Sequence, residues 1–255
     1  TSPTTFVASA NCGRYCDADV DFVDIDPETG LMSCDELEKK LATAKKSNKL
    51  PKIVVPVHLA GNPCDMKRIR SLSDKYNFKI IEDASHALGS KYMDAKIGSC
   101  KYSDITVFSF HPVKIITAGE GGMITTNQED IAKDVMLKRA HGISKCRDEY
   151  KYMEDGDWYY EQQVLGYNYR MNDIEAALGI NQIKRLESIV RERNKILEIY
   201  IEKLESDKVK MIRIPKDCTS ALHLAIALFD VCEQEHVRIF RRLREENIGV
   251  QLHYY

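Results

Sequence analysis

Short apolar runs alternate with amphipathic stretches through the first two hundred residues, and this alternation restricts the possible folds more than any other feature. It is typical of βαβ units, in which helices cover a mostly parallel sheet. A chain of 255 residues with 44% hydrophobic content can bury a sizeable core. The sequence therefore predicts an α/β fold, with strands expected at residues 4–10, 21–25, 52–59, 78–84, 104–110 and 122–127.

Helical patterns lie between several of these runs. Residues 33–46 open with Ser33 and, three positions later, Glu36, which predicts a capping box. Further helices are expected at 65–76 and 128–142, and one long helix from Asn172 to about Glu205.

Beyond that helix, strand-like runs at 208–215 and 221–229 and a helical pattern at 233–246 suggest a smaller α+β unit. We expect a large domain over 1–205 and the start of a second domain over 206–255. The chain begins directly on an expected strand and stops in mid-motif, so we expect it to be part of a longer protein.

The charge, hydropathy and cysteine content of the chain exclude several classes of partner and binding site. Lys and Arg total 37 against 39 Asp and Glu, without a basic concentration, which argues against a nucleic-acid partner. No apolar run reaches the ~18 residues that would span a bilayer, and a cytoplasmic protein is expected. The eight cysteines form no CxxC pair, and His58, His223 and His236 fall on separate expected elements, so no metal site is expected.

Polar side chains gather where two expected strands end. Glu82, Asp83, Ser85 and His86 follow one run, while the run at 104–110 leads to Ser109, His111 and Lys114. Because ligands bind at the carboxyl edge of parallel sheets, this edge is the expected site of chemistry. An acidic strand end is equally compatible with a solvated turn.

Lys114 is the residue that most suggests a reaction. A lysine at a crowded sheet edge, followed by glycines that allow close backbone approach, can lose enough hydration to act as an amine nucleophile and form a Schiff base. Asp83 could keep the ring nitrogen of pyridoxal 5'-phosphate protonated, and Ser109 could donate to its phosphate. A lone lysine in a turn is more commonly a solvated surface charge.

Eight motifs in order decide between these interpretations: FVASAN, VDID, PVHLAGNPCDM, EDASHALGS, FSFHPVK, GEGGMITTN, RAHG and GYNYRM. Together they resemble the DegT/DnrJ/StrS family of nucleotide-sugar aminotransferases. The resemblance implies the type I fold of pyridoxal-phosphate enzymes, with Lys114 bonded to the cofactor, Asp83 on its pyridine nitrogen and Ser109 on its phosphate. By the same resemblance Asn168 reaches the phosphate in a neighbouring subunit, which implies a homodimer with shared sites.

His86 stands where many members carry glutamine, and by the resemblance it lies against the cofactor ring; a packed histidine is the alternative. His111 and His253 could face the substrate or simply pack. The motifs SFHPVK and VQLHYY resemble those of the transaminases of pseudaminic-acid biosynthesis. This resemblance implies glutamate as the amino donor and a UDP-linked 4-keto-6-deoxy sugar as the amino acceptor. Relatives that dehydrate sugars with this cofactor replace the lysine with histidine, so Lys114 argues against that activity.

The sequence departs from the family pattern in one respect: the Gly-Thr/Ser phosphate loop that precedes these motifs in the family is not among the 255 residues. Two alternatives therefore stay open. The chain could be a non-catalytic remnant of the fold, or it could aminate another nucleotide sugar, such as a dTDP-linked one.

Overall fold

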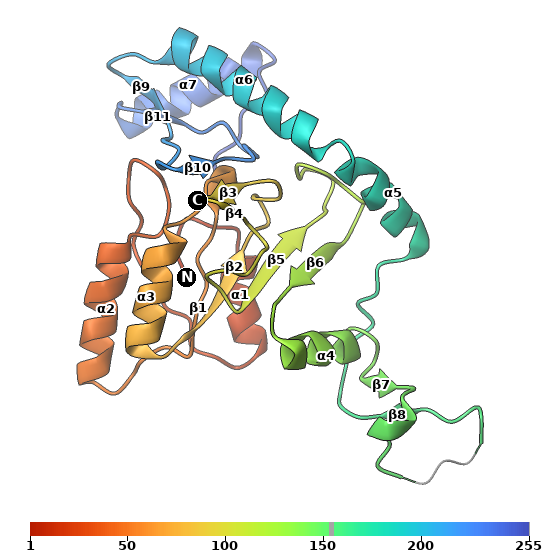
Figure 1. The fold of residues 1–255 in the computed structure, drawn as a ribbon. Helices are drawn as coiled ribbons and strands as arrows, with labels where there is room; N and C mark the ends of the chain where they lie inside the picture. Colours follow the sequence, from red (N-terminus) through yellow and green to blue (C-terminus); the bar gives the residue numbers. More distant parts are fainter. Residues whose placement is uncertain (153–155, 255) are drawn as a thin grey trace.

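The computed structural model describes residues 1–152 and 156–254, and a four-stranded sheet lies at its centre (Figure 1). Its order is β1-β2-β5-β6; β1, β2 and β5 run parallel, and β6 pairs antiparallel with β5. The predicted α/β fold with a mostly parallel sheet is confirmed. The strands are β1 (Ile53–Val54), β2 (Lys79–Asp83), β5 (Ile105–Ser109) and β6 (Gly122–Thr125).

Helices α2 (Cys34–Lys46) and α3 (Met66–Tyr76) pack side by side against the sheet, as expected from their patterns (Figure 1). Ser33 caps α2 by accepting a hydrogen bond from the Glu36 amide at 3.3 Å. The apolar stripes of both helices point inward, and Leu37, Leu41 and Ile69 are nearly inaccessible. Their burial, together with that of β2 and β5, forms the main core.

Three strands predicted in the first sixty residues are wrong or shorter than expected. Residues 4–10 form no strand, and helix α1 (Ala8–Tyr15) begins within them. Residues 21–25 contribute only an isolated bridge at Ile25. The run at 52–59 stops after two strand residues, because Pro56 cannot donate to a ladder.

The expected long helix is two helices, α5 (Asp173–Ile183) and α6 (Leu186–Leu204), which change direction between them (Figure 1). A full capping box, formed by Asn172 and Glu175, starts α5. On α6, Val190 and Leu197 are buried. The apolar spacing continues across the break, which explains why periodicity alone did not reveal it.

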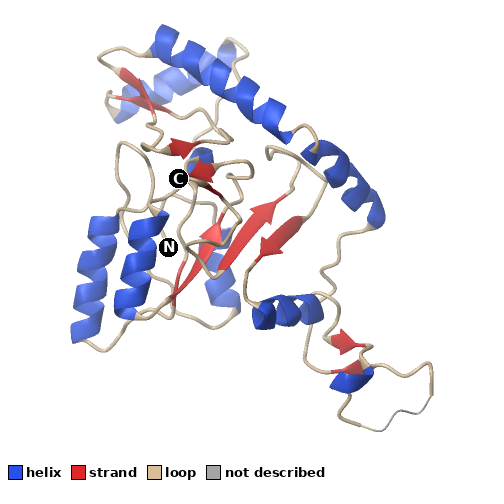
Figure 2. Ribbon diagram, viewed as in Figure 1, coloured by secondary structure: helices blue, strands red, loops and turns tan. Residues whose placement is uncertain are grey.

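Most of the C-terminal elements lie together at one end of this centre, and the segment after α4 (Glu129–Lys138) projects away from it (Figure 2). The strand expected at 221–229 is only three residues long, and the expected helix at 233–246 is confirmed as α7 (Glu233–Glu245). Strand β10 (Cys218–Thr219) lies beyond residue 205 yet pairs with β3 (Lys91–Tyr92), and the two-domain division stays a prediction. These elements are β3 (Lys91–Tyr92), β4 (Ala95–Lys96), α4 (Glu129–Lys138), β7 (Ile143–Ser144), β8 (Glu161–Gln162), β9 (Val209–Met211), β10 (Cys218–Thr219), β11 (Ala227–Phe229), α7 (Glu233–Glu245) and the short helices η1 (Leu59–Gly61) and η2 (Arg147–Glu149). In the described ranges, every helix is too short or too polar to cross a membrane.

Candidate active site

Asp83 is the last residue of β2 and lies at the carboxyl edge of the parallel strands. Its Oδ2 accepts a hydrogen bond from the Ser9 hydroxyl at 2.6 Å, and its Oδ1 accepts one from the Ser85 amide at 3.1 Å. Each carboxylate oxygen thus has a donor and keeps further lone-pair capacity. The arrangement suits an ionised carboxylate that can accept another hydrogen bond.

Lys114 follows β5 in the loop that leads to β6, at the same edge of the sheet. The loop is closed by backbone bonds from the Lys114 amide to the His111 carbonyl at 2.9 Å and from the Ala118 amide to the Phe110 carbonyl at 3.0 Å. Burial lowers the pKa of the Lys114 ammonium, and the negative charge of Asp83 partly opposes this shift. Lys114 and Asp83 therefore share one electrostatic environment, and burial favours the neutral amine.

A cluster of aromatic and imidazole rings adjoins this pair. The His86 ring lies 4.3 Å from the His223 ring, centroid to centroid, and its Nε2 lies 3.3 Å from the Tyr254 hydroxyl. The Nδ1 atoms of His86 and His223 are buried, and neither has a hydrogen-bond partner among the described residues. Such atoms are rare in folded proteins and are expected where a ligand binds.

Burial sets the charge of this cluster. It lowers the pKa of both His86 and His223 to about 3, with the charge of Lys114 contributing in the same direction. The pKa of His253 is lowered first by burial and then by Lys114. Burial, followed by the charge of Asp83, raises the pKa of Tyr254 to about 12. At neutral pH the rings of His86, His223, His253 and Tyr254 are therefore uncharged.

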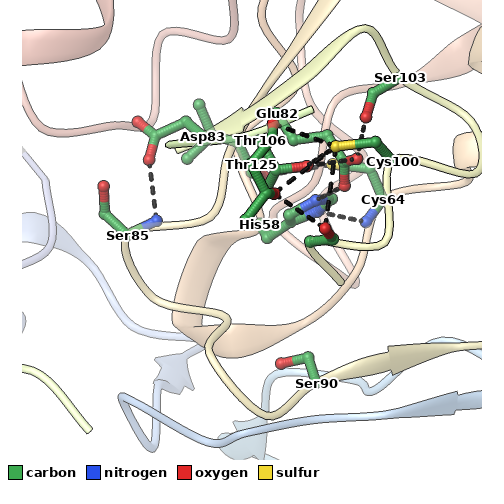
Figure 3. A network of polar contacts seen from close by, with 12 residues as sticks. His58, Cys64, Glu82, Asp83, Ser85, Ser90, Cys100, Ser103, Thr106 and Thr125 are labelled. Carbon is green, nitrogen blue, oxygen red and sulfur yellow. Dashed lines mark hydrogen bonds and ion pairs between the residues drawn. The ribbon is translucent and has the colours of Figure 1, made fainter. Parts of the chain in front are cut away.

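On the other side of β2, Glu82 is the centre of a buried polar network, and the Asp83 carboxylate points away from it (Figure 3). Glu82 Oε2 lies 2.7 Å from His58 Nε2. Glu82 Oε1 accepts hydrogen bonds from the Thr106 hydroxyl at 3.0 Å and from the Ser103 hydroxyl. The Cys64 amide donates to His58 Nδ1 at 3.1 Å, so the neutral ring must carry its proton on Nε2 and donate it to Glu82. The His58 amide also donates to the Asp83 carbonyl at 3.0 Å.

This chain resembles known proteins along its whole length. The model of the DegT/DnrJ/EryC1/StrS aminotransferase family matches residues 1–255. The chain belongs to this family. The expected family membership and the fold that it implies are thereby confirmed.

Two relatives of similar sequence identity are named for different nucleotide sugars. UDP-4-amino-4,6-dideoxy-N-acetyl-beta-L-altrosamine transaminase of Campylobacter jejuni is 38% identical over 258 residues, which cover 100% of this chain and 64% of the relative. GDP-perosamine synthase of Caulobacter vibrioides is 38% identical over 200 residues, covering 78% and 49%. The two relatives are named for sugars on different nucleotides.

Solved structures of family members have the same fold. Helicobacter pylori PseC, an aminotransferase involved in the biosynthesis of pseudoaminic acid, superposes with a TM-score of 0.87 at 27% identity, covering 100% of this chain and 64% of that one. The PLP-form of the putative sugar aminotransferase Spr1654 of Streptococcus pneumoniae gives 0.82 at 27% identity, covering 98% and 65%. The chain thus spans about two thirds of the length of these family members.

The structure brings some of the predicted site residues together. The charge of Lys114 helps to lower the pKa of His86 and of His253, and the charge of Asp83 raises the pKa of Lys114 against the effect of burial. Ser109 ends β5, where its hydroxyl accepts a hydrogen bond from the His111 amide at 3.4 Å, and His111 is exposed. Asn168 is also exposed and forms an isolated bridge with Ala140; within the described part of the chain no contact joins it to Asp83 or Lys114.

Sequence reasoning missed three members of the cluster. Ser9 lies within the FVASAN motif, but nothing in its spacing indicated a contact with Asp83. His223 was interpreted as an unremarkable histidine on a separate element, whereas it lies against His86. Tyr254 lies in the VQLHYY motif that carried part of the resemblance, and this was the only signal for it.

Proposed function

We propose that the polypeptide containing this chain is a pyridoxal 5'-phosphate-dependent aminotransferase, with glutamate as donor and the 4-keto carbon of a UDP-linked 6-deoxy sugar as acceptor. Its place is in the biosynthesis of pseudaminic acid or a related surface sugar. The observation that carries the proposal is the half-buried Lys114 amine, its pKa lowered, beside the hydrogen-bonded Asp83 carboxylate at one sheet edge. A cytoplasmic location remains a prediction from the sequence.

The residues present fit this cofactor. Asp83 offers an oriented carboxylate for a protonated ring nitrogen, and the buried Nδ1 atoms of His86 and His223 lack partners that a polar ligand would supply. Ser109 would hold the phosphate and His86 would lie against the ring. When bound, pyridoxal phosphate supplies an aldehyde that condenses with amines and a ring that accepts electrons.

The side chains of the chain itself would control the protons. Lys114 Nζ, kept neutral more easily by burial, can take the proton from the α-carbon of the donor and later return one to the product. Asp83 would keep a proton on the ring nitrogen, because the two opposite charges stabilise each other. Neutral His86 and His223 add no positive charge that would oppose this proton.

The acceptor is tested by a product assay with glutamate and three 4-keto-6-deoxy sugars, linked to UDP, dTDP and GDP. The UDP-linked N-acetyl sugar should be aminated with a kcat/KM about tenfold or more above the others. His111 and His253 are the proposed substrate contacts, so alanine at either position should raise KM. Preference for dTDP or GDP would overturn the choice of nucleotide, and no product from any sugar, without cofactor binding, would favour a non-catalytic remnant.

We further propose a homodimer. Large apolar side chains lie exposed near Asn168 in the sequence: Leu165 is 86% accessible and Ile174, on α5, is 83% accessible. Such a surface is typical of an interface between subunits. A second copy on this surface would bring Asn168 towards the neighbouring site, as the family resemblance implies.

Replacing Ile174 with aspartate should convert the dimer to a monomer in light scattering and reduce transamination strongly. The cause is a charge placed in an apolar interface, and the substitution is otherwise tolerated because the side chain is exposed within one chain. Leu50→Asp is the matched control, since Leu50 is an exposed apolar residue in the loop after α2, away from α5 (Figure 1). A dimer that persists in Ile174→Asp would place the interface elsewhere.

A further inference from the structure

The Asp83 carboxylate accepts a hydrogen bond from one of two linked hydroxyl groups, which belong to residues near the beginning of the sequence. Ser9 Oγ lies 2.6 Å from Asp83 Oδ2, across a separation of 74 residues, and Thr5 Oγ1 lies 2.8 Å from Ser9 Oγ. Ser9 and Thr5 are both buried. Burial of both hydroxyl groups limits competition from water, and short bonds to an ionised acceptor are the stronger kind.

The direction of each bond follows from the number of hydrogens. An ionised carboxylate has none to give, so Ser9 must donate its single hydroxyl hydrogen to Asp83. Towards Thr5 it can then only accept, and Thr5 must donate. With the Ser85 amide on Oδ1, each carboxylate oxygen receives one donor, which fixes the plane of the group.

We propose that Ser9, supported by Thr5, is a positioning residue that orients the Asp83 carboxylate towards a protonated heterocyclic ring nitrogen. The inference rests on the proposed function, because it needs the cofactor to have such a nitrogen. A carboxylate already held in the right plane loses less freedom when the ring binds. Among residues 1–152 and 156–254, the Ser9 hydroxyl forms hydrogen bonds only with Asp83 and Thr5, so its effect on the ligand passes through Asp83.

The test compares two ligands that differ at one ring atom. Dissociation constants of the apoprotein, made from the complete polypeptide that carries this sequence, are measured by calorimetry for pyridoxal phosphate and for its 1-deaza analogue, which has CH in place of the ring nitrogen. Ser9→Ala should weaken pyridoxal phosphate about tenfold, or about 1.4 kcal/mol, and change the analogue by less than about twofold. Ser9→Thr, which keeps the hydroxyl, should restore binding.

Ser73→Ala is the matched control. Ser73 is also a buried serine on a helix, and its hydroxyl donates to the Phe78 carbonyl without contacting Asp83. This variant loses one buried hydrogen bond, as Ser9→Ala does, but should bind both ligands as the unchanged protein does. Thr5→Val preserves the shape of Thr5 and should show a smaller loss with the same dependence on the ring nitrogen. If Ser9→Ala does not fold, the binding measurements on Thr5→Val test the inference instead.

Two outcomes would overturn the inference while leaving the proposed function intact. They are an equal loss of affinity for both ligands in Ser9→Ala and unchanged affinity for pyridoxal phosphate in Ser9→Ala. If the unchanged protein binds neither ligand, the proposed function fails, and the inference fails with it.

Discussion

Lys114→Ala should abolish transamination in the complete protein. Lys114 has two proposed tasks, bonding to the cofactor aldehyde and moving a proton at the substrate carbon, and both require its amine. Loss of a positioned acid or base alone costs about 10²–10⁴-fold in rate, and loss of the covalent role adds to this. Borohydride reduction followed by peptide mass spectrometry should find the cofactor attached at residue 114 in the unchanged protein and unattached in the variant.

Lys96→Ala provides the control, because Lys96 is an exposed lysine on β4. It should keep both the attachment and the rate. The Lys114→Ala apoprotein should melt no lower than the unchanged apoprotein, since burial disfavours the charge that is removed. Cofactor attached to another lysine, or full activity in the variant, would refute the assignment of Lys114.

Glu82→Ala should cause the largest loss of stability. The variant leaves His58, Ser103 and Thr106 without their shared acceptor in a buried place. Leaving a buried hydrogen-bond donor without an acceptor costs about 1–3 kcal/mol, and three donors lose theirs here. Urea denaturation of the apoprotein measures the free energy of unfolding, and Glu82→Gln, which keeps the volume and one acceptor oxygen, should lose less.

The stability contributed by Glu82 should depend on pH. Burial raises the pKa of the Glu82 carboxyl, but the combined hydrogen bonds from His58, Ser103 and Thr106 outweigh it and hold this pKa below the usual value of 4.5. A lowered carboxyl pKa stabilises the fold above the unfolded-state pKa, and this contribution is lost as the pH falls through the folded-state pKa. The difference in unfolding free energy between the unchanged protein and Glu82→Gln should therefore be constant near neutral pH and shrink below about pH 4.5.

Glu38→Ala is the control for this series, because the Glu38 carboxylate is exposed and pairs with Lys75 on the surface. Its removal should change stability little, as is usual for surface ion pairs. A loss in Glu82→Ala no larger than in Glu38→Ala would show that the buried network does not stabilise the fold.

The sequence alone determined the layers of this protein and the sheet edge at which Asp83 and Lys114 lie. Strands β2 and β5 and helices α2 and α3 were predicted because each buries one periodic face, and periodicity is local information. The polar ends of β2 and β5 placed Asp83 and Lys114 at one edge, since neighbouring parallel strands end on the same side.

Only the tertiary structure decided which side chains complete the site. Ser9 reaches Asp83 across 74 residues, and Tyr254 reaches His86 across 168. Helix α1 and the break between α5 and α6 were likewise invisible to periodicity. These features share one physical reason: they depend on packing between segments that are far apart in the chain. The spacing of residues within one segment does not specify which distant segment it will contact.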